Sequence, residues 1–589
     1  MELTPQLIRE NEKKFWQYNN FKLEISNQIF AERQRIILQL IPFFLNTNIK
    51  GLPGYIDTKN PVCGIANYTF DENILKIIYN RFGFSNLKVP EIKHTAVESL
   101  SLMGSIGTIA QNAKSDFDFW LCYFSDNLDT DDLNLLLEKI RLIEQWCAQN
   151  KVEVHFFPMD IKKIYNNDFG SAGGESCGSA QALLLKDEYF RSLIMIAGKV
   201  PLWWVFPNQE NEKLNITLWE KLKKKDPGLE KLFINIGNIH QVDEKEFFGA
   251  ALWQLVKSLD SPYKSFMKMS LLEKYINAGQ EKVLLSEKLR QTVWASEISV
   301  KKNDHYVLMF DTISEYFMNK NIENVLEILR KCFYLKVQPE LSVCASDKKN
   351  IKINVMSDYC QNWRWDKNKI LYLDQFHKWT MNELMQFDGE LKKYMLNNYL
   401  KLSEALKTRN VSAIISEEDT TIIGRKLISY YVKKPSKVEY FYFSLQDNFF
   451  EECINLLDLK DRWTVTRVKY VANQKDKFTE GAIYSSYYLT DVCIWLAYNN
   501  IYNEWQTDLR MLTERKIEFS DAREFIITIQ KLLKKNSDIL KNPKLFLNES
   551  FIFKSVVTVN FEQDDAIEKT DITFMYKTSY SELYIEHYN

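Results

Sequence analysis

Glycine and proline are scarce in this chain of 589 residues, with 18 and 13 of them respectively. Collagen-like and low-complexity proteins contain far more of both, and disordered proteins contain fewer apolar residues than the 46% found here. The composition therefore excludes these classes and predicts a folded chain. At roughly 100–200 residues per domain, the length predicts about three or four domains.

The nine cysteines form no paired motif. None stands in a Cys-x-x-Cys arrangement, and the closest pair, Cys332 and Cys344, is 12 positions apart. Zinc sites use close cysteine pairs, and disulfide frameworks use an even number of cysteines. We therefore predict reduced thiols and a cytoplasmic protein.

Neither sign of charge is in excess, because the chain has 76 Lys and Arg residues and 78 Asp and Glu residues. A protein that binds long nucleic acid is usually basic, so nucleic acid is not the expected partner.

Long apolar runs are also lacking. The most apolar stretch, Ser192–Phe206, is interrupted by Lys199 and Pro201 and is too short to span a bilayer. No membrane span is predicted, and the charged start of the chain does not resemble a signal peptide.

The spacing of apolar residues predicts an α+β fold. Two short runs rich in strand-forming residues, Leu100–Met103 and Phe117–Phe124, precede an amphipathic helix that Thr130 can cap. A third run, Val152–Phe157, follows the helix, and this order predicts a small mixed sheet with flanking helices. The patterns divide the chain into an N-terminal helical region, a sheet domain, a large helical domain and a C-terminal mixed α/β region, with boundaries at 1–92, 93–208, 209–410 and 411–589.

Two aspartates alternate with two phenylalanines at the start of the second predicted strand, Asp116-Phe117-Asp118-Phe119. Side chains alternate between the faces of a strand, so the aspartates should share one face while the phenylalanines enter the core. Neighbouring carboxylates repel each other unless a cation lies between them, and Mg²⁺ prefers such oxygen ligands. An Asp-x-Asp pair alone is more often a pair of ordinary strand-edge carboxylates.

A Gly-Ser pair, Gly104-Ser105, follows the first predicted strand and precedes the aspartates by about ten residues. Glycine allows the backbone to approach a phosphate closely, and a hydroxyl with free N–H groups can hold one. The two motifs together favour a metal-dependent phosphate site. They also resemble the polymerase-beta-like nucleotidyltransferase superfamily. That resemblance implies a third carboxylate on a later strand, for which Glu153 is the first candidate and Asp160 the alternative.

Further segments resemble class I bacterial adenylate cyclases, namely Leu52–Tyr55, Gly173–Gln181, Ala197–Lys199, Phe248–Lys264 and Arg330–Val337. The resemblance implies conversion of ATP to 3′,5′-cyclic AMP and pyrophosphate. It makes residues 93–208 a nucleotidyltransferase-like catalytic domain, with residues 209–410 contributing to the ATP site. It also implies two Mg²⁺ ions, with Mn²⁺ as an alternative, held by Asp116, Asp118 and Glu153. Larger members of the family continue into a C-terminal regulatory region, which this chain is expected to contain only in part.

The triphosphate of ATP carries about four negative charges, which bound metal ions offset only in part, so lysines are expected around it. Lys257 and Lys264 are seven positions apart and would share one helix face if the helix persists, although Pro262 is expected to begin a new helix. With the resemblance, the predicted substrate contacts are Gly104, Ser105, Ser179, Gln181, Lys199, Lys257 and Lys264.

Two other functions stay open. An intermolecular nucleotidyltransferase would move AMP onto a protein, a small molecule or an RNA end, and its Asp-x-Asp site would be the same because only the acceptor differs. A non-catalytic nucleotide sensor is the third reading. The presence of all three carboxylates speaks against a sensor.

Overall fold

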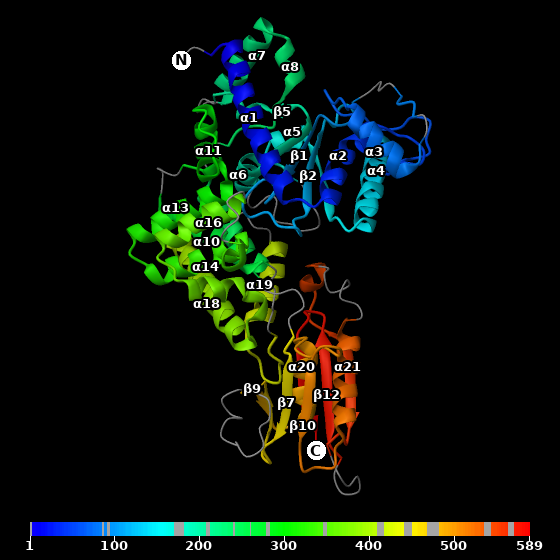
Figure 1. Ribbon diagram of the computed structural model, residues 1–589, viewed down its shortest axis with the longest axis vertical. Helices are drawn as coiled ribbons and strands as arrows, with labels where there is room; N and C mark the ends of the chain where they lie inside the picture. Colours follow the sequence, from blue (N-terminus) through cyan, green and yellow to red (C-terminus); the bar gives the residue numbers. More distant parts are fainter. Residues whose placement is uncertain are drawn as a thin grey trace. The chain divides into compact units, whose positions relative to one another are not determined.

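The computed structural model contains a four-stranded mixed sheet where the sequence predicts strands and a helix (Figure 1). The strand order is β3-β2-β1-β4, in which β1 is antiparallel to β2 and β4, and β2 is parallel to β3. Helix α4 connects β2 to β3 and packs on β3. The bounds are Ser99–Met103 for β1, Phe117–Tyr123 for β2, Thr130–Gln149 for α4, Val154–Asp160 for β3 and Ile194–Gly198 for β4.

Helix α4 begins at Thr130, but Thr130 is not its cap. Asp129 accepts a hydrogen bond from the backbone N–H of Asp132 and caps the helix. The predicted cap was therefore wrong by one residue. The physical reason is that the capping residue lies outside the first helical turn, where its side chain can reach back to the free N–H groups.

The structure describes residues 3–84, 87–90, 95–169, 182–207, 212–239, 242–258, 261–278, 283–344, 350–408, 417–440, 450–467, 482–534, 543–562 and 570–588. The predicted substrate residues Ser179 and Gln181 lie outside these ranges.

By spatial proximity the chain divides into two units, each of which is described by itself. The first comprises residues 1–250, 270–374 and 405–414, and the second comprises residues 251–269, 375–404 and 415–589.

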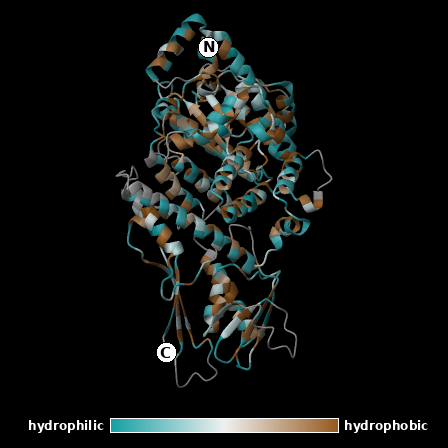
Figure 2. Ribbon diagram, turned by 90° about the vertical axis from the view of Figure 1, so that its left-hand side faces the viewer, coloured by the Kyte–Doolittle hydropathy of each residue, from teal (hydrophilic) through white to brown (hydrophobic). Residues whose placement is uncertain are grey.

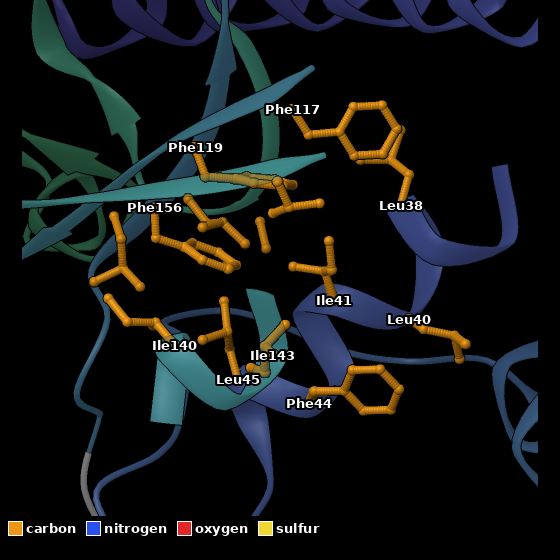
Figure 3. Close-up of a cluster of buried hydrophobic side chains, with 14 of the residues drawn as sticks. Leu38, Leu40, Ile41, Phe44, Leu45, Phe117, Phe119, Ile140, Ile143 and Phe156 are labelled. Carbon is orange, nitrogen blue, oxygen red and sulfur yellow. The ribbon is translucent and has the colours of Figure 1, made fainter. Parts of the chain in front are cut away.

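The sheet separates two apolar clusters because its side chains alternate between its faces. Phe117 and Phe119 of β2 are fully buried on one face, as predicted, while Trp120 belongs to the cluster on the other face. Figure 3 shows the first cluster, in which side chains of β2 and β3 meet those of α2 (Glu32–Asn46) and α4. Phe119 stacks on Phe156 of β3, with ring centroids 5.1 Å apart. This packing fixes β2 against β3 and hence the register of the polar residues at their ends.

Helices make up most of the rest of the first unit. The long N-terminal helix α1 (Pro5–Ile29) contacts β4 and also α11 (Leu285–Trp294). The other elements are α3 Glu72–Phe82, α5 Ile161–Tyr165, α6 Ala182–Ser192, β5 Val200–Pro201, α7 Glu212–Lys225, α8 Gly228–Leu232, β6 Phe233–Ile234, α12 Val300–Asn303, α13 His305–Asn319, α14 Glu323–Val337, α15 Leu341–Cys344, α16 Ile351–Asn362 and α17 Lys367–Asp374. Among the described elements, three helices contribute residues to both units, namely α9 Glu244–Lys257, α10 Pro262–Asn277 and α18 Met381–Thr408.

The second unit is mixed α/β. One sheet has the order β10-β7-β8-β9, and β11, β12 and β13 form a separate antiparallel sheet. Helix α20 is almost wholly buried, because its apolar residues run along all of its sides. The bounds are α19 Glu417–Tyr431, β7 Cys453–Asp458, β8 Trp463–Thr466, β9 Ala482–Ser486, α20 Leu489–Tyr498, β10 Asp508–Leu512, α21 Phe519–Lys534, β11 Ile552–Val559, β12 Ile572–Thr578 and β13 Leu583–Tyr588.

Within the described part of the chain, no helix combines the length and the apolar character that a membrane crossing requires. Figure 2 shows hydrophilic and hydrophobic residues side by side along the helices. Small mixed sheets among many helices confirm the predicted α+β fold class. The division into four domains stays a prediction.

Adjacent residues of α4 offer a test of the core. Leu136 is fully buried, whereas the neighbouring Leu137 is 40% exposed. We expect Leu136→Ala to lower the free energy of unfolding by about 2–5 kcal/mol, because it leaves a cavity against the sheet. Leu137→Ala removes the same atoms from the same helix and should cost about 1 kcal/mol or less. Urea unfolding of the intact chain measures both, and equal losses would contradict this packing.

Candidate active site

Several polar residues that the sequence predicts for the site lie together at one edge of the four-stranded sheet, where strands begin or end. The antiparallel pairing sets Met103, the last residue of β1, opposite Asp118 of β2. The parallel pairing sets Asp118 opposite His155 of β3. The end of β1 and the starts of β2 and β3 therefore meet at the same edge. Gly104, Asp116 and Glu153 lie directly beside these strand ends.

Three side chains at this edge can reach a common point. Donor atoms of Asp116, Glu153 and His155 all lie within 4.8 Å of one another, and all three residues are exposed. His155 Nε2 lies 3.0 Å from Glu153 Oε1. Asp118 is half-buried and opposes His155 in the strand register. Carboxylate oxygens with one imidazole nitrogen form a donor set that suits a divalent cation.

The electrostatic field at this edge is negative. Partial burial by itself would lower the pKa of His155, but the hydrogen bond with Glu153 and the charges of Asp118, Glu153 and Glu144 outweigh it. The net effect is a raised pKa for His155, because its cationic form is favoured beside several carboxylates. The same field would attract a metal cation.

The loop between β1 and β2, residues 104–116, starts with a left-handed turn. Gly104 has φ +102°, and a Cβ added there would lie 3.9 Å from Asp118 Oδ2. Glycine is suited to this position because side chains disfavour such a backbone conformation. The hydroxyls of Ser105 and Ser115 lie 3.1 Å apart, which ties the two ends of the loop together. The backbone at Gly104 thus lies beside an aspartate.

A buried aspartate anchors the middle of this loop. Asp304 is 3% exposed, and its Oδ2 accepts a 2.6 Å hydrogen bond from the N–H of Ile109. Its Oδ1 accepts hydrogen bonds from the N–H groups of Tyr306 and Val307, so the same carboxylate caps α13. Burial raises the pKa of Asp304 to about 6, although the backbone hydrogen bonds oppose this rise. Sequence reasoning missed Asp304, since the only local signal was an aspartate that can cap a helix.

Two residues predicted for the site lie away from this edge. Asp160 is at the far end of β3, where it caps α5 by accepting a hydrogen bond from the N–H of Lys162. Lys199 follows β4, which pairs Gly198 with Ser99 at the opposite end of β1. The Lys199 ammonium lies 2.7 Å from Glu98 Oε2, and both side chains are largely buried. The structure therefore brings Glu153, rather than Asp160 or Lys199, next to Asp116.

The two remaining lysines belong to the second unit. Helix α9 ends at Lys257, and α10 begins at Pro262 as predicted, so no single helix carries both Lys257 and Lys264. The Lys257 ammonium lies over the Trp253 ring, 5.1 Å from its centroid.

Replacing Asp304 tests the anchoring of the loop. In Asp304→Asn the amide oxygen can still accept the hydrogen bonds from the N–H groups of α13. The amide NH₂ group would then face the N–H of Ile109, so this N–H would lose its acceptor. A buried donor without a partner costs about 1–3 kcal/mol, and we expect a loss of unfolding free energy of this size. Hydrogen exchange should rise at Ile109. The control is Asp358→Asn, which breaks an exposed pair with Lys301 and should cost less than about 1 kcal/mol. Unchanged exchange at Ile109 would contradict the anchoring role.

Comparison with known proteins identifies two consecutive family regions. Residues 8–204 match the family model described as the adenylate cyclase NT domain, and residues 242–441 match the second domain of class I adenylate cyclase. No solved structure matches the chain.

Curated relatives agree with these matches. The chain is 32% identical to an adenylate cyclase of Escherichia coli (strain K12) over 435 residues, which is 71% of this chain and 50% of the relative. The figures are the same for an adenylate cyclase of Salmonella typhimurium, and one of Proteus mirabilis is 30% identical over 426 residues. The chain spans about half the length of the curated relatives it matches. With the N-terminal and second domains both present in order, the chain belongs to the class I adenylate cyclase family.

Proposed function

We propose that this protein is an adenylate cyclase that converts ATP to 3′,5′-cyclic AMP and pyrophosphate. The observation that carries the proposal is that Asp116 and Glu153 have donor atoms within 4.8 Å of each other, while Asp118 lies beside the Gly104 turn at the same sheet edge, in a chain of this family. In the reaction, the ribose 3′-oxygen bonds to the α-phosphorus, the bond from that phosphorus to the β-phosphate bridging oxygen breaks, and the 3′-hydroxyl proton leaves.

The carboxylates Asp116, Asp118 and Glu153 are the proposed ligands of two Mg²⁺ ions, with Mn²⁺ as the alternative. When bound, such ions lower the pKa of the attacking hydroxyl and offset negative charge on the triphosphate. The donor set fits, because it is rich in oxygen and lies in a negative field.

The loop residues Gly104 and Ser105 are proposed to hold the β- and γ-phosphates. Glycine presents no side chain to an approaching phosphate, and the Ser105 hydroxyl can donate a hydrogen bond. The anchoring of the same loop through Ile109 supports this role, because a fixed loop loses less conformational entropy when it binds a ligand.

The family resemblance supports further proposed substrate contacts, made by Ser179, Gln181, Lys199, Lys257 and Lys264. Of these, Lys199 lies at the other end of β1 from Gly104, so its contact would be to a different part of the substrate. A cytoplasmic location also stays a prediction, as does any regulatory partner.

The carboxylates give the most direct mutational test. We expect Asp116→Asn, Asp118→Asn and Glu153→Gln each to reduce cyclic AMP formation about a thousandfold or more, because loss of a metal ligand removes several kcal/mol of transition-state stabilisation. Asp160→Asn is the matched control, since Asp160 lies at the other end of β3, and it should keep most of the activity. Thermal melts check that each variant folds. If Asp160→Asn were the severe variant, the assignment of the third carboxylate would be wrong.

Product analysis separates the cyclase from its rivals. Purified chain incubated with ATP and Mg²⁺ alone should yield cyclic AMP and pyrophosphate in equal amounts. A transferase would instead need an added acceptor and form an AMP adduct, and a sensor would bind ATP without turnover. Either of these results would overturn the proposal.

The lysines are tested by kinetics. A lost contact to the triphosphate is worth about 1.5–3 kcal/mol, so Lys257→Ala and Lys264→Ala should each lower kcat/KM for ATP about ten- to a hundredfold. The effect falls on kcat if the contact strengthens in the transition state and on KM if it does not. Lys199→Ala also breaks the ion pair with Glu98, so its melting temperature must be compared with its kinetics. Wild-type kinetics for all three would remove the lysines from the ATP site.

A further inference from the structure

We propose that His155 is a nitrogen donor of the candidate metal site and raises its affinity for transition-metal ions such as Mn²⁺ relative to Mg²⁺. This inference rests on the proposed function, because it assigns a role at the same site. Strand β3 places the imidazole of His155 beside the carboxylates of the candidate site.

The strand register points His155 at the carboxylates. Residues 154 and 156 are buried, so the residue between them emerges on the opposite side of the strand. Its Cα pairs with that of Asp118 in the neighbouring parallel strand. Along β2, Asp118 lies on the face opposite to that of the buried phenylalanines Phe117 and Phe119. His155 therefore lies on the same face of the sheet as Asp118.

The distances allow a shared ion. A nitrogen of His155 and carboxylate oxygens of Asp116 and Glu153 are all within 4.8 Å of one another. Donors that each lie about 2.0–2.2 Å from one metal ion are separated by no more than about twice that length. Small side-chain rotations are therefore enough to bring the three donors to one ion. All three side chains are exposed and have room for such rotations.

The contact that His155 makes with Glu153 adds little to stability. His155 Nε2 pairs with Glu153 at 3.0 Å, and the two side chains are 48% and 69% exposed. An ion pair this exposed contributes little to stability. A bound cation would take the Glu153 oxygen and the His155 nitrogen as two of its ligands in place of this contact.

The chemical consequence is a change in metal preference. Mg²⁺ binds oxygen ligands and is held poorly by imidazole, whereas transition-metal ions accept nitrogen and oxygen together. Asp116, Asp118 and Glu153 alone would form an oxygen site. With His155 added, the site should favour Mn²⁺ over Mg²⁺.

The test measures metal binding by the intact chain without nucleotide. Pulsed electron paramagnetic resonance of bound Mn²⁺ should show coupling to a ¹⁴N nucleus in the wild type, and this coupling should vanish in His155→Ala. Calorimetric titration should show Mn²⁺ affinity falling about tenfold or more in His155→Ala, with Mg²⁺ affinity changing less than about threefold. His377→Ala is the matched control, because His377 is also exposed and belongs to none of the potential metal clusters among the described residues. It should leave both affinities unchanged.

Several results would overturn the inference. They are the absence of ¹⁴N coupling in the wild type, coupling that survives in His155→Ala, or an equal loss of Mn²⁺ and Mg²⁺ affinity in that variant. Failure of the proposed function can be distinguished from failure of this inference. In that case the wild type would show the ¹⁴N coupling but form no cyclic AMP from ATP and Mg²⁺. Cyclic AMP formation without ¹⁴N coupling would leave the cyclase standing and reject the role of His155.

Discussion

The parallel pairing of β2 with β3 is the constraint on which the candidate site depends. Asp116, Asp118 and Glu153 come together because β2 pairs in parallel with β3, and the stacked pair Phe119 and Phe156 helps to hold that pairing. The pairing of the two strands places these carboxylates side by side, where a cation would reduce the repulsion between neighbouring negative charges.

The loop that faces the carboxylates is fixed from several directions. Asp304 accepts from the N–H of Ile109, Lys352 donates to the carbonyl of Gln111, and Gln34 donates to the carbonyl of Ala113. Burial lowers the pKa of Lys352 to about 8. These partners belong to α2, to α16 and to the residue that caps α13. The helices of the first unit therefore also hold the loop by hydrogen bonds. They hold the backbone on which the proposed phosphate contacts lie.

Local patterns predicted much of this arrangement. Alternation along Asp116–Phe119 predicted the strand and the burial of its phenylalanines, and the helical spacing that followed predicted α4. Contacts far apart in the sequence could not be predicted in the same way. Asp304 lies 195 positions from its partner Ile109, and no local pattern connects them. The pairing of Lys199 with Glu98 likewise follows from the position of β4 beside β1, which a single sequence does not give. The position of His155 beside Asp118 also depends on the register of β3 against β2, which local patterns do not specify.

A crystal structure of the chain with Mn²⁺ and 3′-deoxy-ATP would locate the metal and the triphosphate relative to these carboxylates. The missing 3′-hydroxyl prevents cyclisation, and anomalous scattering locates the metal. We expect anomalous density about 2.0–2.3 Å from oxygens of Asp116 and Asp118, with the triphosphate beside Gly104 and Ser105. Metal and triphosphate bound elsewhere, with these carboxylates facing only solvent, would contradict this expectation.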